Sequence, residues 1–272
     1  MIVNIAGYRF VDINNTEEMK NIFLEKCLDL KLKGTIYFSR NGINFFVAGT
    51  QEMIDKYIEF MELDERLVGI SLKISYTEYQ PFRRMIVKKK KEIIALGLDE
   101  VRPAEHTSPS INPKELKKWL DEERDILLLD TRNDYELRIG TFEKSVDLDI
   151  KTFRQFPAAI EKLNIDKDKT VVMFCTGGIR CEKASVVMEN QGWNNVYQLE
   201  GGVLNYFEEV GGEHWNGDCF VFDQRVALNS ELMETGIEMC FICREPLSEE
   251  EQKSEEYKIM EYCPYCINKN KK

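Results

Sequence analysis

The sequence has few histidines, no long apolar run and no spaced glycine motif for a dinucleotide. Two histidines in 272 residues offer no His/carboxylate triad of the kind that binds non-haem iron. Gly177-Gly178 lacks the third spaced glycine of a dinucleotide loop, so no flavin or nicotinamide fingerprint is evident. No haem site is evident either. No apolar run approaches the roughly 20 residues of a transmembrane helix, which predicts no membrane partner. Residues 1–4 do not begin a secretory signal, so we expect a cytoplasmic protein.

The chain is acidic overall but carries one strongly basic stretch. A formal net charge of −11 argues against a protein that coats nucleic acid nonspecifically. From Tyr79 to Lys91, however, the sequence holds no acidic residue. We interpret this stretch as an extended RNA-binding arm or extra strand, in which an aromatic ring stacks on a base and cations meet phosphates. The alternative is an edge strand that lysines protect from aggregation. The candidate RNA-binding residues are Phe82, Arg83, Arg84, Lys88, Lys89, Lys90 and Lys91.

The first domain, residues 1–98, is predicted to have the ferredoxin-like order β-α-β-β-α-β, an acylphosphatase-like α+β fold. Alternating and amphipathic patterns indicate its elements, with a hairpin turn at Asn41-Gly42. The expected strands are 2–11, 34–39, 43–48 and 70–76, and the expected helices are 13–32 and 51–63. Residues 99–112 form the expected linker, because prolines interrupt any apolar period there.

The second domain, residues 113–217, is predicted to be an α/β domain with a parallel sheet, because buried strands alternate with helices. The expected strands are 126–130, 146–148, 170–174 and 196–199, and the expected helices are 114–120, 153–163 and 204–210. A further helix is expected directly after residue 180. The remaining residues, 218–272, are predicted to form a small Cys-rich segment.

Cys175 begins a loop between the strand 170–174 and the following helix, where ligands of open α/β sheets bind. Backbone amides of the loop and the helix N-terminus favour a negative charge there. Such surroundings lower the pKa of a thiol from about 8.5 to roughly 3.5–7.5, so we expect Cys175 to be a nucleophilic thiolate. The alternative is an inert buried cysteine before an ordinary turn. The other loop residues are Thr176, Gly177, Gly178, Ile179 and Arg180, the last of which adds positive charge.

Three further residues are expected to support this loop. Asp130 and Arg132 follow the strand 126–130 and are predicted to pair and fix the neighbouring loop. Cys181 either resolves an oxidised Cys175 as a disulfide or only packs in the helix. Cysteine-dependent phosphatases separate Cys and Arg by five residues, whereas four separate them here. The resulting six-residue loop suits a persulfide sulfur and resembles the active loop of rhodanese-like domains.

The C-terminal segment contains two CxxC pairs with 19 residues between them. Eight cysteines in a chain expected to be intracellular favour metal binding or catalysis over disulfides. Two pairs at this spacing predict a tetrahedral structural zinc site. The alternative is two unrelated reduced pairs. The predicted ligands are Cys240, Cys243, Cys263 and Cys266.

Together these segments resemble the rhodanese-domain family of tRNA uridine hydroxylases over nearly the whole chain. The resemblance is carried by residues 33–35, 42–44, 47–49, 81–85, 130–136, 175–185, 199–202, 217–223 and the paired cysteines. One departure is Asn41, where the family usually places an acidic residue. The resemblance implies hydroxylation of the tRNA wobble uridine to 5-hydroxyuridine with molecular oxygen as a substrate, and it carries the active-loop cysteine onto Cys175. The thiolate either adds to a pyrimidine carbon or carries an oxidised sulfur that delivers oxygen.

Two other functions fit parts of the sequence. A sulfurtransferase would carry a persulfide on Cys175, but one that acts on small molecules needs neither a basic arm nor a zinc-type tail. A noncatalytic RNA-binding or redox-sensing module would use Cys175 only as an oxidisable group, and the intact six-residue loop disfavours it.

Overall fold

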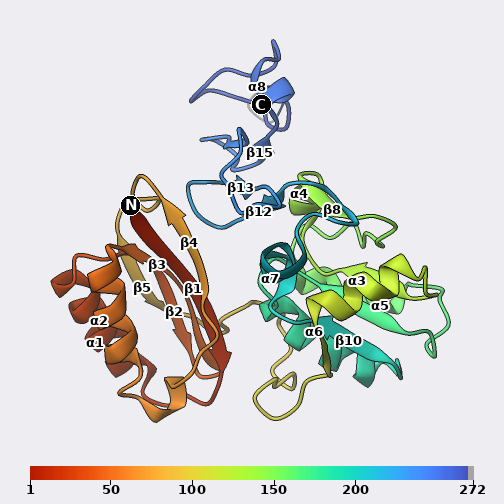
Figure 1. Cartoon of the computed structure of the whole chain (residues 1–272), viewed down its shortest axis with the longest axis horizontal. Helices are drawn as coiled ribbons and strands as arrows, with labels where there is room; N and C mark the ends of the chain where they lie inside the picture. The colour runs from red at the N-terminus through yellow and green to blue at the C-terminus, as the bar shows by residue number, and fades with distance from the viewer. Residues whose placement is uncertain (269–272) are drawn as a thin grey trace. The chain divides into compact units, whose positions relative to one another are not determined.

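The computed structural model describes residues 1–268 of the chain (Figure 1). Residues 269–272 of the expected C-terminal segment lie outside the described part. The chain divides into two compact units. The first comprises Met1–Ser108 with Glu182–Gly192, and the second comprises Pro109–Cys181 with Trp193–Lys272. Among residues 1–268, no helix has both the length and the apolar character needed to cross a membrane.

The first unit contains the predicted β-α-β-β-α-β arrangement with one extra strand. Its sheet has the order β4-β1-β3-β2-β5, in which β5 is parallel to β2 and the other neighbours are antiparallel. The elements are β1 Ile2–Phe10, α1 Thr16–Asp29, β2 Lys33–Ser39, β3 Gly42–Gly49, α2 Gln51–Met61, the 3₁₀ turn Glu65–Leu67, β4 Lys73–Thr77 and β5 Met85–Lys89. Helix α1 is shorter than the predicted 13–32, because Ile13 and Leu32 are buried core residues without being helical.

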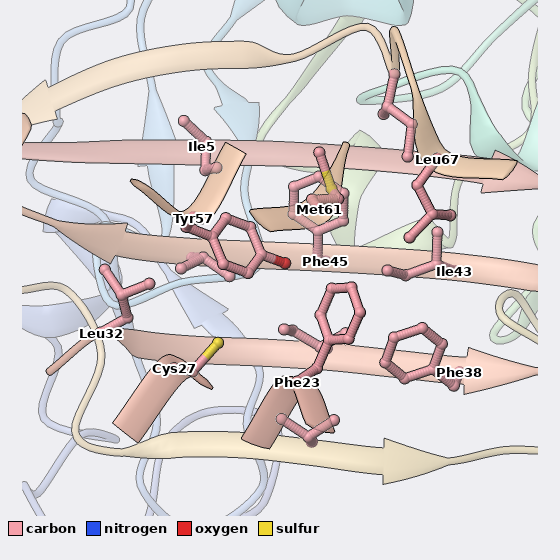
Figure 2. Packing of buried hydrophobic residues seen from close by; sticks show 14 of the residues in the cluster. Ile5, Phe23, Cys27, Leu32, Phe38, Ile43, Phe45, Tyr57, Met61 and Leu67 are labelled. Atoms are coloured by element: carbon pink, nitrogen blue, oxygen red, sulfur yellow. The ribbon is translucent and has the colours of Figure 1, made fainter. Parts of the chain in front are cut away.

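Helices α1 and α2 cover one face of this sheet, and the core of the unit lies between the helices and the sheet. Strand residues alternate between the two faces, so only every second residue reaches the helices. Phe38 of β2 meets Phe23 of α1 with ring centroids 5.0 Å apart, and Phe45 of β3 meets Tyr57 of α2 at 6.1 Å. Figure 2 shows these rings packed among aliphatic side chains of the same cluster.

Strand β5 contains part of the basic stretch. Its register runs from Gly34 opposite Met85 to Phe38 opposite Lys89, at the edge of the sheet. The stretch therefore forms an extra strand, and its position at the edge also agrees with the lysine-protected alternative. All six of its cations are exposed, whereas Phe82 is partly buried.

The second unit has a four-stranded, fully parallel sheet in the order β6-β10-β9-β7, as the alternation of strands and helices predicted. Its elements are β6 Ser110–Ile111, α3 Pro113–Asp121, β7 Leu127–Asp130, α4 Asp134–Leu137, β8 Gly140–Phe142, the 3₁₀ turn Phe153–Gln155, α5 Phe156–Glu161, β9 Val171–Phe174, the start of α6 Ile179–Asn190, β10 Val196–Leu199, α7 Gly202–Val210 and β11 Trp215–Gly217. Helix α6 belongs to this unit only as far as Cys181, since Glu182–Gly192 is part of the first unit. The predicted strand 146–148 is wrong, because only Val146 forms a single bridge, with Leu129. The predicted helix 153–163 is divided between the 3₁₀ turn Phe153–Gln155 and α5, which ends at Glu161.

The C-terminal segment belongs to the second unit and is built from short hairpins. Its elements are β12 Cys219–Phe220, β13 Ala227–Leu228, β14 Glu238–Met239, β15 Pro246–Leu247 and α8 Glu249–Gln252. The last part of the segment has a small apolar cluster of its own, in which Leu247 and three tyrosines surround four cysteines. So few apolar side chains bury little surface, which makes this segment dependent on another source of stability.

Candidate active site and metal-binding cluster

The loop after β9 places the sulfur of Cys175 against backbone amides. Strand β9 ends at Phe174 and α6 begins at Ile179, as the strand–loop–helix interpretation predicted. The Cys175 Sγ accepts a hydrogen bond from the Gly178 N–H at 3.1 Å. The amides of Gly177 and Arg180 also donate toward it. The sulfur is buried, but its surroundings are polar and carry positive charge.

These surroundings decide the ionisation of Cys175. Burial by itself disfavours a thiolate. A hydrogen bond from the Cys181 thiol, the charge of Arg180 and the backbone amides together outweigh burial, and they hold the pKa of Cys175 well below its ordinary value. The geometry therefore favours the nucleophilic form that the sequence predicted.

Cys181 lies beside Cys175 in the first turn of α6. Burial, followed by its hydrogen bond to Cys175, raises the pKa of Cys181 well above its ordinary value. Cys181 therefore remains a neutral thiol that donates to the thiolate, and its sulfur lies 3.7 Å from the Thr131 hydroxyl. A resolving role for Cys181 needs its sulfur to contact that of Cys175, and the hydrogen bond between them provides this contact. The resolving role itself stays a prediction.

Arg180 forms an ion pair that sequence reasoning missed. Its guanidinium donates to both carboxylate oxygens of Glu136 in α4, at 2.6 and 2.8 Å. Both side chains are almost fully buried, with 5% and 0% exposed. Burial works against the charge of Glu136, but Arg180 outweighs it and holds the pKa of Glu136 below its ordinary value. Glu136 thus orients the cation that stabilises the Cys175 thiolate.

Replacing Glu136 with glutamine is expected to destabilise the protein by about 3–5 kcal/mol, because it leaves the Arg180 charge buried without its partner. Urea unfolding of the purified chain measures this change. Glu245→Gln is the matched control, because Glu245 pairs with Arg138 at a partly exposed position, with 31% and 34% of the side chains exposed. The control should cost no more than about 1 kcal/mol. Equal costs for the two variants would contradict the role of Glu136.

Gly202 allows the turn before α7 to contact the active loop. A Cβ atom at Gly202 would lie 2.4 Å from the Cys175 carbonyl oxygen and 2.8 Å from the Gly178 nitrogen. Its φ of +70° also lies in the left-handed region. Val203 N–H donates to the Cys175 carbonyl at 2.9 Å. The turn therefore packs closely against the active loop, and this packing requires glycine at position 202.

Asp130 and Arg132 form the predicted pair at the end of β7. Arg132 Nη2 donates to Asp130 Oδ2 at 2.6 Å, and both side chains are fully buried. The same nitrogen donates to the Gly140 carbonyl at 2.6 Å. Between the two residues, Thr131 donates both its N–H and its hydroxyl to the Phe174 carbonyl, at 3.0 and 2.9 Å. The pair thus fixes a turn that is bonded to the residue directly before Cys175.

Phe222 is an aromatic residue beside the loop for which the sequence predicted no role. It is 48% exposed, and its ring centroid lies 5.9 Å from the Arg180 guanidinium carbon. Its ring also meets that of Phe220 edge-on at 5.2 Å. The Phe220 carbonyl accepts a hydrogen bond from the Thr176 hydroxyl at 3.3 Å. The segment that carries Phe222 is therefore bonded to the active loop.

The four predicted metal ligands lie together. Their sulfur atoms are all within 4.8 Å of one another. Cys243 Sγ lies 3.4 Å from Cys263 Sγ, which lies 3.7 Å from Cys266 Sγ. Sulfurs about 2.3 Å from a tetrahedral metal lie about 3.8 Å apart, so these distances fit a four-thiolate centre. None of the eight cysteines forms a disulfide, which leaves this cluster available for a metal ion.

Two family models match successive parts of the chain. Residues 2–93 match the family described as UPF0176 acylphosphatase like domain, and residues 112–209 match the family described as Rhodanese-like domain. A protein of Cupriavidus pinatubonensis named tRNA uridine(34) hydroxylase is 47% identical over 275 residues, covering 99% of this chain and 98% of the relative. A protein of Cupriavidus necator with the same name is 48% identical over 272 residues, covering 98% and 96%. The chain belongs to the tRNA uridine(34) hydroxylase family.

Family membership confirms the resemblance drawn from the sequence motifs and makes this chain an enzyme. It also confirms the predicted fold class, with an acylphosphatase-like domain followed by a rhodanese-like domain. Among solved structures, the rhodanese-like domain of an Anabaena protein is 20% identical with a TM-score of 0.35, covering 40% of this chain and 80% of that one.

Proposed function

We propose that this enzyme hydroxylates uridine 34 of tRNA to 5-hydroxyuridine and that Cys175 is its reacting group. The observation that carries this proposal is a cysteine held as a thiolate by amides and Arg180, in a chain whose relatives bear the hydroxylase name over nearly their full length. The enzyme acts in the cytoplasm, where its proposed substrate is found.

The proposed chemistry replaces the C5 hydrogen of uracil with a hydroxyl group. With molecular oxygen as the oxidant, one oxygen atom enters the base and the other leaves as water. Each turnover therefore consumes two electrons and two protons, which we assign to a pair of reductant thiols that end as a disulfide. The Cys175 thiolate adds to C6 of the ring, which makes C5 electron-rich. The sulfur leaves again when the C5 proton is lost, so the cysteine is regenerated.

The surroundings of the loop suit this role. Arg180 is fixed by Glu136 and keeps its charge near the sulfur before addition and after release. The neutral Cys181 thiol can hydrogen-bond to the sulfur without competing for the base. We assign exposed Phe222, whose ring lies beside Arg180, to stacking on the target uracil.

Nucleoside analysis of tRNA tests this function. A strain that lacks the gene is complemented with the wild-type chain or with Cys175→Ala, and its tRNA nucleosides are identified by mass spectrometry. We expect 5-hydroxyuridine derivatives to return only with the wild type. Full restoration by Cys175→Ala would instead favour a noncatalytic module. The names of the relatives already favour hydroxylation over sulfur transfer.

We assign a structural zinc ion to the four-cysteine cluster. Four thiolates in two CxxC pairs are a usual ligand set of structural zinc, whereas a catalytic zinc site keeps one position open. The ion would hold the two CxxC pairs together in a segment that has only a small apolar cluster.

We also propose that the exposed cations of the basic stretch bind the tRNA backbone. The triple charge reversal Arg83→Glu, Arg84→Glu and Lys88→Glu is expected to lower tRNA affinity at least tenfold. Because each lost phosphate contact removes about 0.7–0.9 from the slope of log affinity against log salt, that slope should become shallower by roughly two to three. Fluorescence anisotropy across a salt series measures both quantities.

The control for this prediction reverses three charges elsewhere on the chain, at Lys114, Lys118 and Lys144, whose side chains are 72%, 67% and 83% exposed. This control should keep most of the affinity and the salt slope. If reversal in the basic stretch left both unchanged, the stretch would be only a protected sheet edge.

A further inference from the structure

Tyr135 is a partly buried side chain beside the active loop for which the proposed chemistry has no use so far. It lies in α4 directly before Glu136, whose carboxylate holds the Arg180 guanidinium. The charge of Arg180 acts on the Tyr135 hydroxyl and also on the Cys175 sulfur. The phenol, the guanidinium and the sulfur are therefore parts of one site.

Two edge-on ring contacts connect Tyr135 with Phe222. The ring centroid of Tyr135 lies 5.3 Å from that of Phe220, which lies 5.2 Å from that of Phe222. The Phe220 carbonyl also accepts a hydrogen bond from Thr176 of the active loop. Because Phe222 is the ring that we assign to stacking on the target uracil, Tyr135 belongs to the group of side chains around the expected position of the base.

The hydroxyl of Tyr135 is held through its oxygen. The side-chain amide of Asn133 donates a hydrogen bond to this oxygen at 3.2 Å. The backbone N–H of Asn133 donates to Glu136 Oε2 at 3.1 Å, so the carboxylate that holds Arg180 also fixes the residue that holds the phenol. Within residues 1–268, the Tyr135 hydroxyl donates to no other group. A phenol that accepts one bond still has its O–H to donate to a ligand.

Tyr135 keeps its proton under conditions in which Cys175 has lost its own. Burial and then the negative charge of Glu136 raise the pKa of Tyr135 to about 12, although the Asn133 bond and Arg180 act in the opposite direction. The pKa of Cys175 lies well below its ordinary value. At neutral pH the site therefore holds a thiolate nucleophile and a neutral hydrogen-bond donor together.

Addition of the sulfur to uracil places negative charge on an oxygen atom. The electron pair of the Cys175 thiolate forms the S–C6 bond, the C5=C6 π bond breaks, and its electrons move onto C5 and the C4 carbonyl oxygen, O4. Donors of the active loop are already engaged, since the Gly178 N–H donates to the sulfur and both terminal nitrogens of Arg180 donate to Glu136. A preorganised donor for O4 must therefore come from another element, and such a donor lowers the barrier.

We propose that Tyr135 is a further catalytic residue, whose hydroxyl donates a hydrogen bond to O4 of the target uracil while Cys175 is bonded to C6. The proton stays on the phenol, so this bond stabilises the enolate without transferring an atom. When the C5 proton is lost and the sulfur leaves with its electron pair, the C5=C6 double bond and the C4 carbonyl are restored. The inference rests on the proposed function, because it needs the thiolate to add to C6.

Kinetics of Tyr135→Phe test this role with the full chain, molecular oxygen, dithiothreitol and a tRNA transcript that has uridine at position 34. The ring and its packing on Phe220 remain, and only the hydroxyl is lost. The rate at saturating tRNA should fall about 100- to 1,000-fold, the usual effect of removing one such donor. KM for tRNA should stay within about twofold, because the bond to the enolate does not form in the ground state. Mass spectrometry of nucleosides measures the product.

Two further measurements separate catalysis from packing. Tyr197→Phe is the matched control, because Tyr197 is also partly buried and its ring meets that of Trp119 edge-on at 5.7 Å. This control should keep the wild-type rate. In Tyr135→Phe, the urea unfolding midpoint and the thiolate absorbance of Cys175, measured against the same chain with Cys175→Ser, should match the wild type. A merely structural role would displace Arg180 and therefore shift the thiolate titration.

The outcomes separate this inference from the proposed function. If Tyr135→Phe retains its rate within about threefold, far less than the loss of an oxyanion donor, the hydroxyl has no catalytic role. A loss of rate that comes with an altered thiolate titration also overturns that role. In both cases the wild type still makes 5-hydroxyuridine, so the proposed function stands. If the wild type makes none, or if Cys175→Ser makes it as well, the proposed function fails and the role of Tyr135 fails with it.

Discussion

Replacing Cys175 with serine is expected to abolish hydroxylation by the purified enzyme while leaving the fold intact. Serine has nearly the same shape, but its hydroxyl does not ionise near neutral pH and is a poor nucleophile without a general base. The loop amides and Arg180 would then have no anion to stabilise. Mass spectrometry of nucleosides from treated tRNA measures the reaction, and its product should fall to background.

The ionisation of Cys175 can be observed directly as the difference in ultraviolet thiolate absorbance between the wild type and Cys175→Ser. Because the pKa of Cys175 lies well below its ordinary value, one thiolate should appear at a pH well below that of a free thiol. Activity should be lost as the pH falls through this step. Burial raises the pKa values of Cys27 and Cys219 to about 12, so neither contributes in this range. Turnover by the serine variant would refute the assignment.

The fold of the first unit could be predicted because its signals are local. Alternation in the strands and the Asn41-Gly42 turn set the order of elements, and both depend on residues close in sequence. The boundaries of α1 could not be predicted, because Ile13 and Leu32 are buried core residues that continue the helical pattern beyond the helix. A hydrophobic pattern reports burial, and burial extends past the ends of an element.

The parts of the candidate site that could be predicted are contiguous in sequence. The residues from Cys175 to Arg180 form one loop, and the four cysteines of the C-terminal segment can be recognised from the spacing of their two CxxC pairs. Glu136 could not be found in this way, because its partner Arg180 is 44 residues away and a carboxylate in sequence gives no sign of burial. The stretch 130–136 was part of the family resemblance, which was the available signal. The position of Phe222 likewise depends on tertiary contacts of β12.

Removing the metal from the four-cysteine cluster is expected to unfold the segment around it and to leave the parallel sheet folded. Structural zinc contributes on the order of 10–16 kcal/mol of binding free energy, which here would be folding free energy. Chelation should therefore make the segment after β14 sensitive to protease, and added zinc should restore resistance. Elemental analysis should find one zinc per chain before chelation and none after it.

The rest of the second unit should be nearly unaffected by chelation, because its contacts with the four-cysteine cluster are partly exposed and therefore weak. Arg138 of α4 pairs with Glu245 at 2.5 Å and lies 4.0 Å from the Tyr265 ring centroid, contacts that contribute about 0–2 kcal/mol together. Cys263→Ser should reproduce the effect of chelation, whereas Cys27→Ala, outside the cluster, should retain the metal. Protein that is purified without metal, or that resists protease equally after chelation, would show that the segment is stabilised by its own packing.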